Sequence, residues 1–138
     1  MCCRACKSPG VEFEITFSDA GSAADVDIAV RGVPTAAEFA KVNEQLVGDP
    51  RFRAGLKMLV DCSALDTSPL TPEDVQQLTE PMVMRDWHYP PLAVALVAPD
   101  DATYEAARAY RAHLGGSRSN RQVFRSRADA EAWLAEQE

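Results

Sequence analysis

The chain has 138 residues, of which 46% are hydrophobic and 25% charged, as is ordinary for one globular domain with a buried core. Its 21 acidic residues outnumber its 14 basic ones, and the formal charge of −7 disfavours nucleic acid and anionic membrane surfaces as partners. The longest apolar run, 92–98, is far shorter than the ~20 residues of a membrane span, so we expect none.

Residues 1–10 form a cysteine-rich leader ahead of a single expected domain at 11–138. The leader holds three of the four cysteines, Cys2, Cys3 and Cys6. A structural zinc site needs a second C-x-x-C pair, and a redox C-x-x-C opens a helix after a strand, so we expect neither here. The leader has no apolar stretch typical of a signal peptide, which predicts a cytoplasmic location with reduced thiols.

Two segments near the start of the domain alternate apolar and polar residues, as a strand with one wet face does. They span 11–18 and 24–31 and flank a turn at 19–22. The pattern predicts an antiparallel hairpin whose first strand lies at the edge of a sheet.

A helix is expected next, with Thr35 as its N-cap and Glu38 completing a capping box. Phe39, Val42 and Leu46 recur at helical spacing and form its buried face, and Gly48 ends it.

The segment 56–62 is the central feature of the sequence. Its apolar run stops at Asp61-Cys62-Ser63, and such a run suits a strand that is buried on both faces. Ligands of open α/β sheets gather beyond the carboxyl ends of such strands. We therefore expect a functional rim at Asp61, Cys62 and Ser63, followed by a loop over 63–70.

A second helix begins at the N-cap Thr71 and buries Val75, Leu78 and Met82, but Pro81 must end or kink it. Three apolar side chains follow close together at the kink: Met82, Met84 and Trp87. The sequence leaves open whether they belong to the core or form an exposed apolar patch.

The remaining segments alternate between strand and helix. We expect a strand at 92–98, a helix from Asp100-Asp101 to Leu114, a strand at 122–125 and a last helix after the N-cap Ser126. The order β-β-α-β-α-β-α-β-α predicts an α/β domain with a mostly parallel five-stranded sheet and helices on both faces.

This order, together with the segments 61–65 and 122–134, resembles the SpoIIAA-like (STAS/SEC14-type) group of small bacterial proteins. Asp61-Cys62-Ser63-Ala64-Leu65 is similar to the Asp-Ser-Ser-Gly-Leu signature of anti-sigma-factor antagonists, with Cys62 for the first serine and Ala64 for the glycine. The resemblance covers 11–137. It implies a STAS-type fold, and it implies that Ser63, which matches the phosphorylated serine, is the acceptor of a phosphoryl group from a partner kinase.

The first functional hypothesis is a non-enzymatic regulatory or protein-interaction module with a kinase or anti-sigma-like partner. A phosphate on Ser63 adds roughly −1.5 to −2 charge beside Asp61 and Asp66, and the repulsion would release a partner. The plainer interpretation is that Ser63 hydrogen-bonds backbone groups in a turn.

The alternative hypothesis is a carrier or sensor of a small apolar ligand or lipid in a pocket beneath the kinked second helix. Either hypothesis places the contact surface on the same residues: Asp61, Cys62, Ser63, Asp66, Leu78, Met82, Met84 and Trp87. An exposed patch there would also favour a homodimer.

A weaker third hypothesis is a Mg²⁺-dependent phosphotransfer enzyme, because carboxylates at adjacent strand ends are ligands that Mg²⁺ prefers. The candidates are Asp61, Asp66, Asp100 and Asp101. Each has an ordinary explanation as a helix cap or loop residue, and no hydrolase or nucleotide-binding motif accompanies them. Arg118 and Arg121, in 115–121, could bind an anion, but a solvated loop is the better interpretation. We therefore expect no catalysis, metal or cofactor.

Overall fold

The computed structural model of the chain describes residues 11–18, 23–53, 55–83, 92–114 and 119–137. Several features expected from the sequence lie outside the described residues: the leader 1–10, the turn 19–22, Met84, Trp87 and Arg118.

Five strands pair in the order β2-β3-β4-β5-β6. Their bounds are β2 (Val11–Phe17), β3 (Val26–Gly32), β4 (Lys57–Leu65), β5 (Ala93–Val97) and β6 (Asn120–Phe124). β2 runs antiparallel to β3, and the other three pairings are parallel. The predicted hairpin, its edge position and the mostly parallel sheet are confirmed.

The helices begin at the predicted N-caps. Their bounds are α1 (Ala36–Val47), α2 (Pro72–Leu78), α4 (Asp101–His113) and α5 (Arg127–Ala135), with the caps Thr35, Thr71, Asp100 and Ser126. Each cap side chain accepts the backbone N–H three residues on, which satisfies a donor that the first helical turn leaves open. None of the described helices has the length and apolar character that crossing a membrane requires.

The second helix breaks where the sequence predicts. α2 ends at Leu78 with Thr79 as its C-cap, and residues 80–83 return to helix. The Thr79 hydroxyl donates to the Gln76 carbonyl at 2.6 Å. Pro81 has no N–H and disfavours helical backbone at the residue before it, so the turn that precedes it is interrupted.

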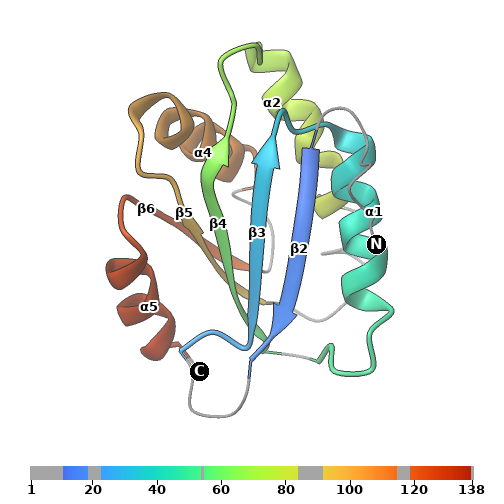
Figure 1. Ribbon diagram of the computed structural model, residues 1–138, viewed down its shortest axis with the longest axis vertical. Coiled ribbons are helices and arrows are strands. Elements are labelled where there is room, and N and C mark those ends of the chain that lie inside the picture. Colours follow the sequence, from blue (N-terminus) through green and yellow to red (C-terminus); the bar gives the residue numbers. More distant parts are fainter. Residues whose placement is uncertain (1–10, 19–22, 54, 84–91, 115–118, 138) are drawn as a thin grey trace.

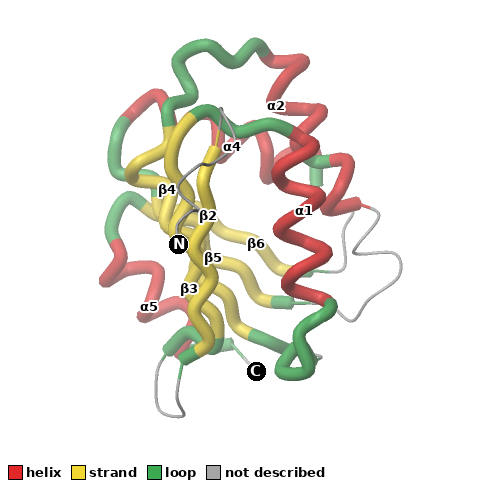
Figure 2. The backbone as a smooth tube through the Cα atoms, turned by 45° about the vertical axis from the view of Figure 1, so that its right-hand side comes forward, coloured by secondary structure: helices red, strands yellow, loops and turns green. Residues whose placement is uncertain are grey.

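Within the described ranges, one face of the sheet is covered by α1, α2 and α4, and the other by α5. Each of the strands β3, β4, β5 and β6 lies beside its predecessor, and right-handed crossovers between such neighbours keep every connecting helix on the same side. Figure 1 shows β2, β3 and β4 side by side, and Figure 2 shows α1 and α2 on one side of the sheet with α5 across from them. α4 packs against α2. Helices on both faces were predicted, and this uneven division follows from the strand order.

The core accordingly has two parts. Beneath α1, α2 and α4 lies a larger cluster, formed by Val26, Ile28, Val30, Leu46, Leu56, Met58, Cys62, Leu92, Val94 and Leu96. Beneath α5 lies a smaller one, formed by Ala24, Leu59, Ala95, Val97, Ala130 and Leu134. β4 contributes Met58 to the first and Leu59 to the second, so it is buried on both faces as predicted.

β4 is longer than predicted. We expected a loop over 63–70, but the strand continues to Leu65, because Ala64 and Leu65 pair with Arg31 and Gly32 of β3. Its pairing with β5 reaches only as far as Asp61. The end of β4 is therefore a strand supported on one side, and the connection to α2 begins at Asp66.

We expect Leu59→Ala to lower the free energy of unfolding by about 2–5 kcal/mol, because Leu59 is fully buried between β4 and α5. Leu65→Ala, the same substitution at the half-buried end of the same strand, should cost clearly less. Urea unfolding measures both. Equal losses would contradict the placement of Leu59 in the second core.

Candidate functional site

The Asp61-Cys62-Ser63 segment forms a β-bulge. From Asp61 to Ala64, β4 has one residue more than the facing part of β3, from Ala29 to Arg31. A bulge shifts the alternation of side chains along its strand. Cys62 and, beyond the bulge, Leu65 line a cavity under the helices, whereas Asp61 and Ser63 do not.

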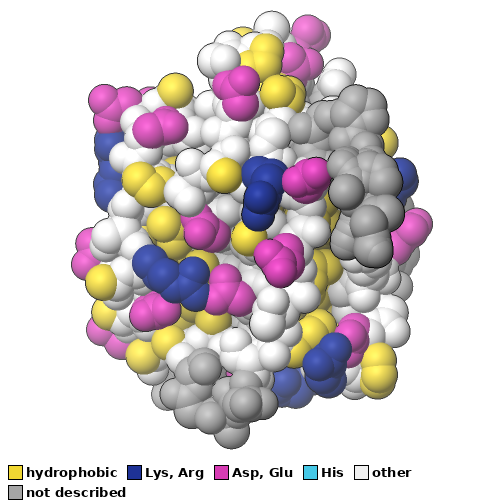
Figure 3. All heavy atoms as spheres, viewed as in Figure 1, with side chains coloured by type: hydrophobic (Ala, Val, Ile, Leu, Met, Phe, Trp, Pro, Cys, Tyr) yellow, Lys and Arg dark blue, Asp and Glu magenta, His cyan; other side chains and the backbone are white. Residues whose placement is uncertain are grey.

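Asp61 and Ser63 form a polar pair on the side of the sheet that faces away from that cavity. The Ser63 hydroxyl donates to Asp61 Oδ1 at 2.7 Å, and the Ser63 N–H donates to the same oxygen at 3.0 Å. Ser63 is exposed. Acidic and basic side chains intermix over the visible face of β2, β3 and β4 (Figure 3). Arg31 of β3 pairs with Glu12 of β2 at 3.8 Å.

Cys62 does not share this surface. Its side chain is 6% exposed and packs in the larger core, so the expectation of one polar rim was wrong for the thiol. Successive residues of a strand point to opposite faces, and the segment therefore splits between the two sides of the sheet. Burial, and secondarily the charge of Asp61, raise the pKa of the Cys62 thiol to about 12.

The other predicted carboxylates hold local structure. Asp66 accepts from the N–H and hydroxyl of Ser68, which lowers the pKa of Asp66. Asp100 caps α4 through Thr103, whose backbone and hydroxyl hydrogen bonds lower the pKa of Asp100. Asp101 pairs with Arg125 at 2.6 Å. Among the residues that the structure describes, no three acidic, cysteine or histidine side chains come together as a metal site requires.

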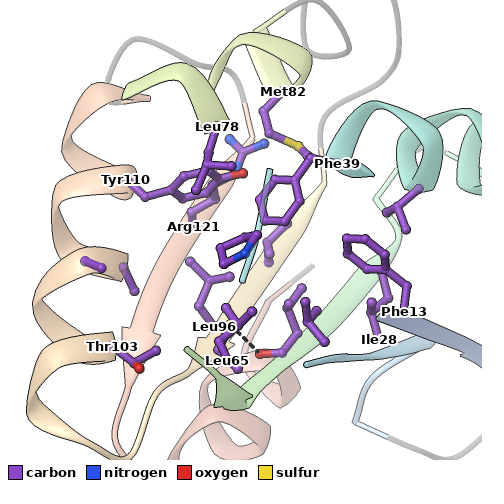
Figure 4. Close-up of a pocket in the computed structure, with 18 of the residues that line it drawn as sticks. Phe13, Ile28, Phe39, Leu65, Leu78, Met82, Leu96, Thr103, Tyr110 and Arg121 are labelled. Atoms are coloured by element: carbon purple, nitrogen blue, oxygen red, sulfur yellow. Dashed lines mark hydrogen bonds between the residues drawn. The ribbon is translucent and has the colours of Figure 1, made fainter. Parts of the chain in front are cut away.

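A cavity of about 100 Å³ lies between the sheet and the helices α1, α2 and α4. Leu78 and Met82, predicted for the pocket beneath the kinked second helix, line one end of it, and Leu65 and Leu96 line the other (Figure 4). Met82 is only 8% exposed, so it belongs to the core alternative and not to an exposed patch. The residues of the predicted contact surface therefore lie in two places. Asp61 and Ser63 face away from the cavity, whereas Leu78 and Met82 line it.

Three aromatic side chains that the sequence analysis did not assign to a site form one wall of the cavity. Phe39 of α1 lies edge-on to Phe13 of β2 and to Tyr110 of α4, with ring centroids 5.7 Å and 6.2 Å apart. Phe13 and Phe39 were on predicted buried faces. Only the packing of three separate elements brings the rings together, and no local pattern signals that.

Arg121 also lines the cavity. It was expected in a solvated loop, but it lies in β6 and is 5% exposed. The expectation was wrong because β6 starts at Asn120, two residues before the predicted strand. Among the described residues that line the cavity, Arg121 is the only charged one, and a buried guanidinium disfavours a cationic ligand.

A second hollow of about 280 Å³ opens at the surface beside α1 and α2. Three residues line both this outer groove and the inner cavity: Pro34, Leu70 and Leu78. The groove also has polar lining residues, Thr35, Asp74 and Gln77. The cavity and the surface groove therefore adjoin at these three side chains.

Comparison with known proteins defines the fold. No protein-family model matches the chain, and no curated protein does. It is similar to the crystal structure of an uncharacterized protein of the DUF3478 family with a SpoIIAA-like fold, from Shewanella loihica PV-4. The TM-score is 0.56 and the identity 16%, over 91% of this chain and 94% of the other.

The protein is therefore an α/β module with a SpoIIAA-like fold, as the sequence predicted. At 16% identity the likeness extends to the fold alone, so any function must come from the geometry described above.

We expect the Cys62 thiol to resist an aromatic disulfide reagent at pH 8 in native protein whose Cys2, Cys3 and Cys6 are replaced by serine. The buried thiol stays protonated far above its ordinary pKa of 9.0. One thiol should react once guanidinium unfolds the chain. Rapid labelling of the native protein would contradict the burial.

The same pKa shift predicts a pH dependence of stability. A thiol whose pKa is raised from 9.0 to about 12 favours the folded state fully below pH 9, and this contribution is lost as the pH rises towards 12. The free energy of unfolding of the Cys2, Cys3 and Cys6 serine variant should therefore fall over that range, and adding Cys62→Ala should remove this part of the fall.

Proposed function

We propose that this SpoIIAA-like module is non-enzymatic and binds a small apolar ligand in the cavity between the sheet and α1, α2 and α4. The observation that carries the proposal is the cavity itself, about 100 Å³ of space within the main core. Protein interiors are close-packed and contain few voids larger than a water molecule. A void of this size sacrifices packing, and a ligand would restore it.

The lining supports an apolar ligand. Side chains from the sheet include Ile28, Val30 and Val60, and α4 contributes Ala106 and Ala107. An apolar cavity of about 150 Å³ stays dry and binds benzene or xenon. A cavity of about two thirds that size suits a group of on the order of four to six carbon atoms.

We expect xenon and fluorobenzene to bind the protein, measured by ¹²⁹Xe and ¹⁹F chemical shifts and by a rise of the melting temperature with ligand concentration. Ala107→Leu, which places a larger side chain in the cavity, should reduce fluorobenzene affinity at least tenfold. Ala112→Leu is the matched control, because Ala112 is an exposed residue of the same helix and does not line the cavity.

Two outcomes would overturn the proposal. One is that neither xenon nor fluorobenzene changes its chemical shift or raises the melting temperature of the unaltered protein. The other is fluorobenzene binding that Ala107→Leu leaves unchanged, because the probe would then lie somewhere else.

A second candidate function, phosphorylation of Ser63 by a partner kinase, is favoured by a separate observation. The Ser63 hydroxyl is exposed, and it already donates to a carboxylate 2.7 Å away. A phosphate there would carry roughly −1.5 to −2 charge next to Asp61. It would replace an attractive hydrogen bond with electrostatic repulsion. A partner that contacts the sheet next to Asp61 and Ser63 would then be released.

Ser68→Ala provides a matched control for Ser63→Ala. Ser68 is also exposed, and its hydroxyl and N–H donate to Asp66 Oδ1 at 2.7 Å and 3.1 Å. In an extract of the source cells with ATP, we expect mass spectrometry to detect phosphate at residue 63 in the unaltered protein and in Ser68→Ala. Total incorporation should fall at least tenfold in Ser63→Ala; equal incorporation in all three proteins, or none, would refute the switch.

A further inference from the structure

The inner cavity and the outer groove share one wall. Pro34, Leu70 and Leu78 line both spaces, so the two spaces adjoin at these side chains. Pro34 and Leu78 are buried, whereas Leu70 is half-buried and lies on the connection between β4 and α2. Leu70 is therefore the member of the wall that can turn away with the least loss of core contact.

From this shared wall we propose that the ligand is an elongated amphipathic molecule whose apolar end fills the inner cavity and whose uncharged polar end lies in the outer groove. The inference rests on the proposed function, and it deepens that function by naming the class of ligand. In the bound state the Leu70 side chain turns aside, and the ligand passes between Pro34 and Leu78.

The volumes support one site in two parts. The inner cavity of about 100 Å³ and the groove of about 280 Å³ are each smaller than the roughly 300–1,000 Å³ of ordinary small-molecule pockets. Together they reach that range. A molecule confined to the inner cavity would have few atoms with which to be recognised, whereas one that extends into the groove gains both apolar area and hydrogen bonds.

The charged side chains of the outer groove constrain the outer end of the ligand. Among the described residues, Arg121 is the one charged residue that lines the inner cavity, beside polar Asn43 and Thr103, and Asp74 supplies a carboxylate to the outer groove. Asp74 Oδ2 accepts the Thr71 N–H at 2.9 Å within the capping box, so this carboxylate is held at the groove. A hydroxyl or amide at the outer end can donate to Asp74 or Gln77, whereas a carboxylate there would be repelled by Asp74.

The test is a series of primary n-alkanols from ethanol to decanol, measured by displacement of fluorobenzene. Burying one more methylene is worth about 0.8 kcal/mol, or about a fourfold rise in affinity. We expect this rise to continue beyond about six carbons, where the inner cavity is full, and to extend to about ten. Alkanoates of equal length should bind at least tenfold more weakly than the alkanols.

Ala36→Trp places a large side chain in the groove, since Ala36 lines it and does not line the inner cavity. In this variant the rise in affinity should stop at about six carbons, while fluorobenzene binds as before and shows that the protein is folded. Ala37→Trp is the matched control, because Ala37 is the next residue of α1, is exposed and lines neither space. It should retain the full series.

The outcomes separate the two proposals. If neither xenon nor fluorobenzene binds the unaltered protein, the proposed function fails. If fluorobenzene binds but alkanol affinity levels off at about six carbons, or if Ala36→Trp and Ala37→Trp behave alike, the two-part site is wrong and the cavity stands. If alkanoates bind more tightly than alkanols, the uncharged outer end is wrong.

Discussion

The handedness of the strand connections is the constraint on which the rest of the structure depends. Because β3 to β6 are added side by side through right-handed crossovers, α1, α2 and α4 must share one face of the sheet. α2 has only seven residues before Thr79 caps it ahead of Pro81, so the middle of that helical layer is short. Residues of α2 line both the cavity and the groove.

β4 connects the two candidate sites without joining them. Cys62 of this strand lines the cavity beneath α1, α2 and α4. Asp61 and Ser63 lie on the side of the sheet that faces away from the cavity. The thiol is protonated and buried, and it lines the cavity. The hydroxyl is exposed and paired with a carboxylate, so it is the accessible group of the segment. Adjacent residues therefore have different chemistry because they face different surroundings.

Local patterns in the sequence determined much of this protein. Alternation predicted the edge hairpin, the residues Thr35, Thr71, Asp100 and Ser126 predicted the helix starts, and Pro81 predicted the break after α2. The polar end of a buried run indicated β4 as the centre of the fold. These features depend on contacts within a few residues, such as a cap with its first turn or a proline with its missing N–H, so the chain itself carries the signal.

The tertiary structure alone decided how those elements meet. The bulge that turns Leu65 inwards arises from the register of β3 against β4, and the strand position of Arg121 arises from its pairing with β5. The aromatic wall needs Phe13, Phe39 and Tyr110 from three elements that are far apart in the chain. A cavity is a property of how completely side chains fill a space, and that depends on the positions of all the surrounding elements at once. For this reason the sequence indicated a pocket beneath the second helix, but only the packed fold showed its size, its lining and its shared wall with the surface.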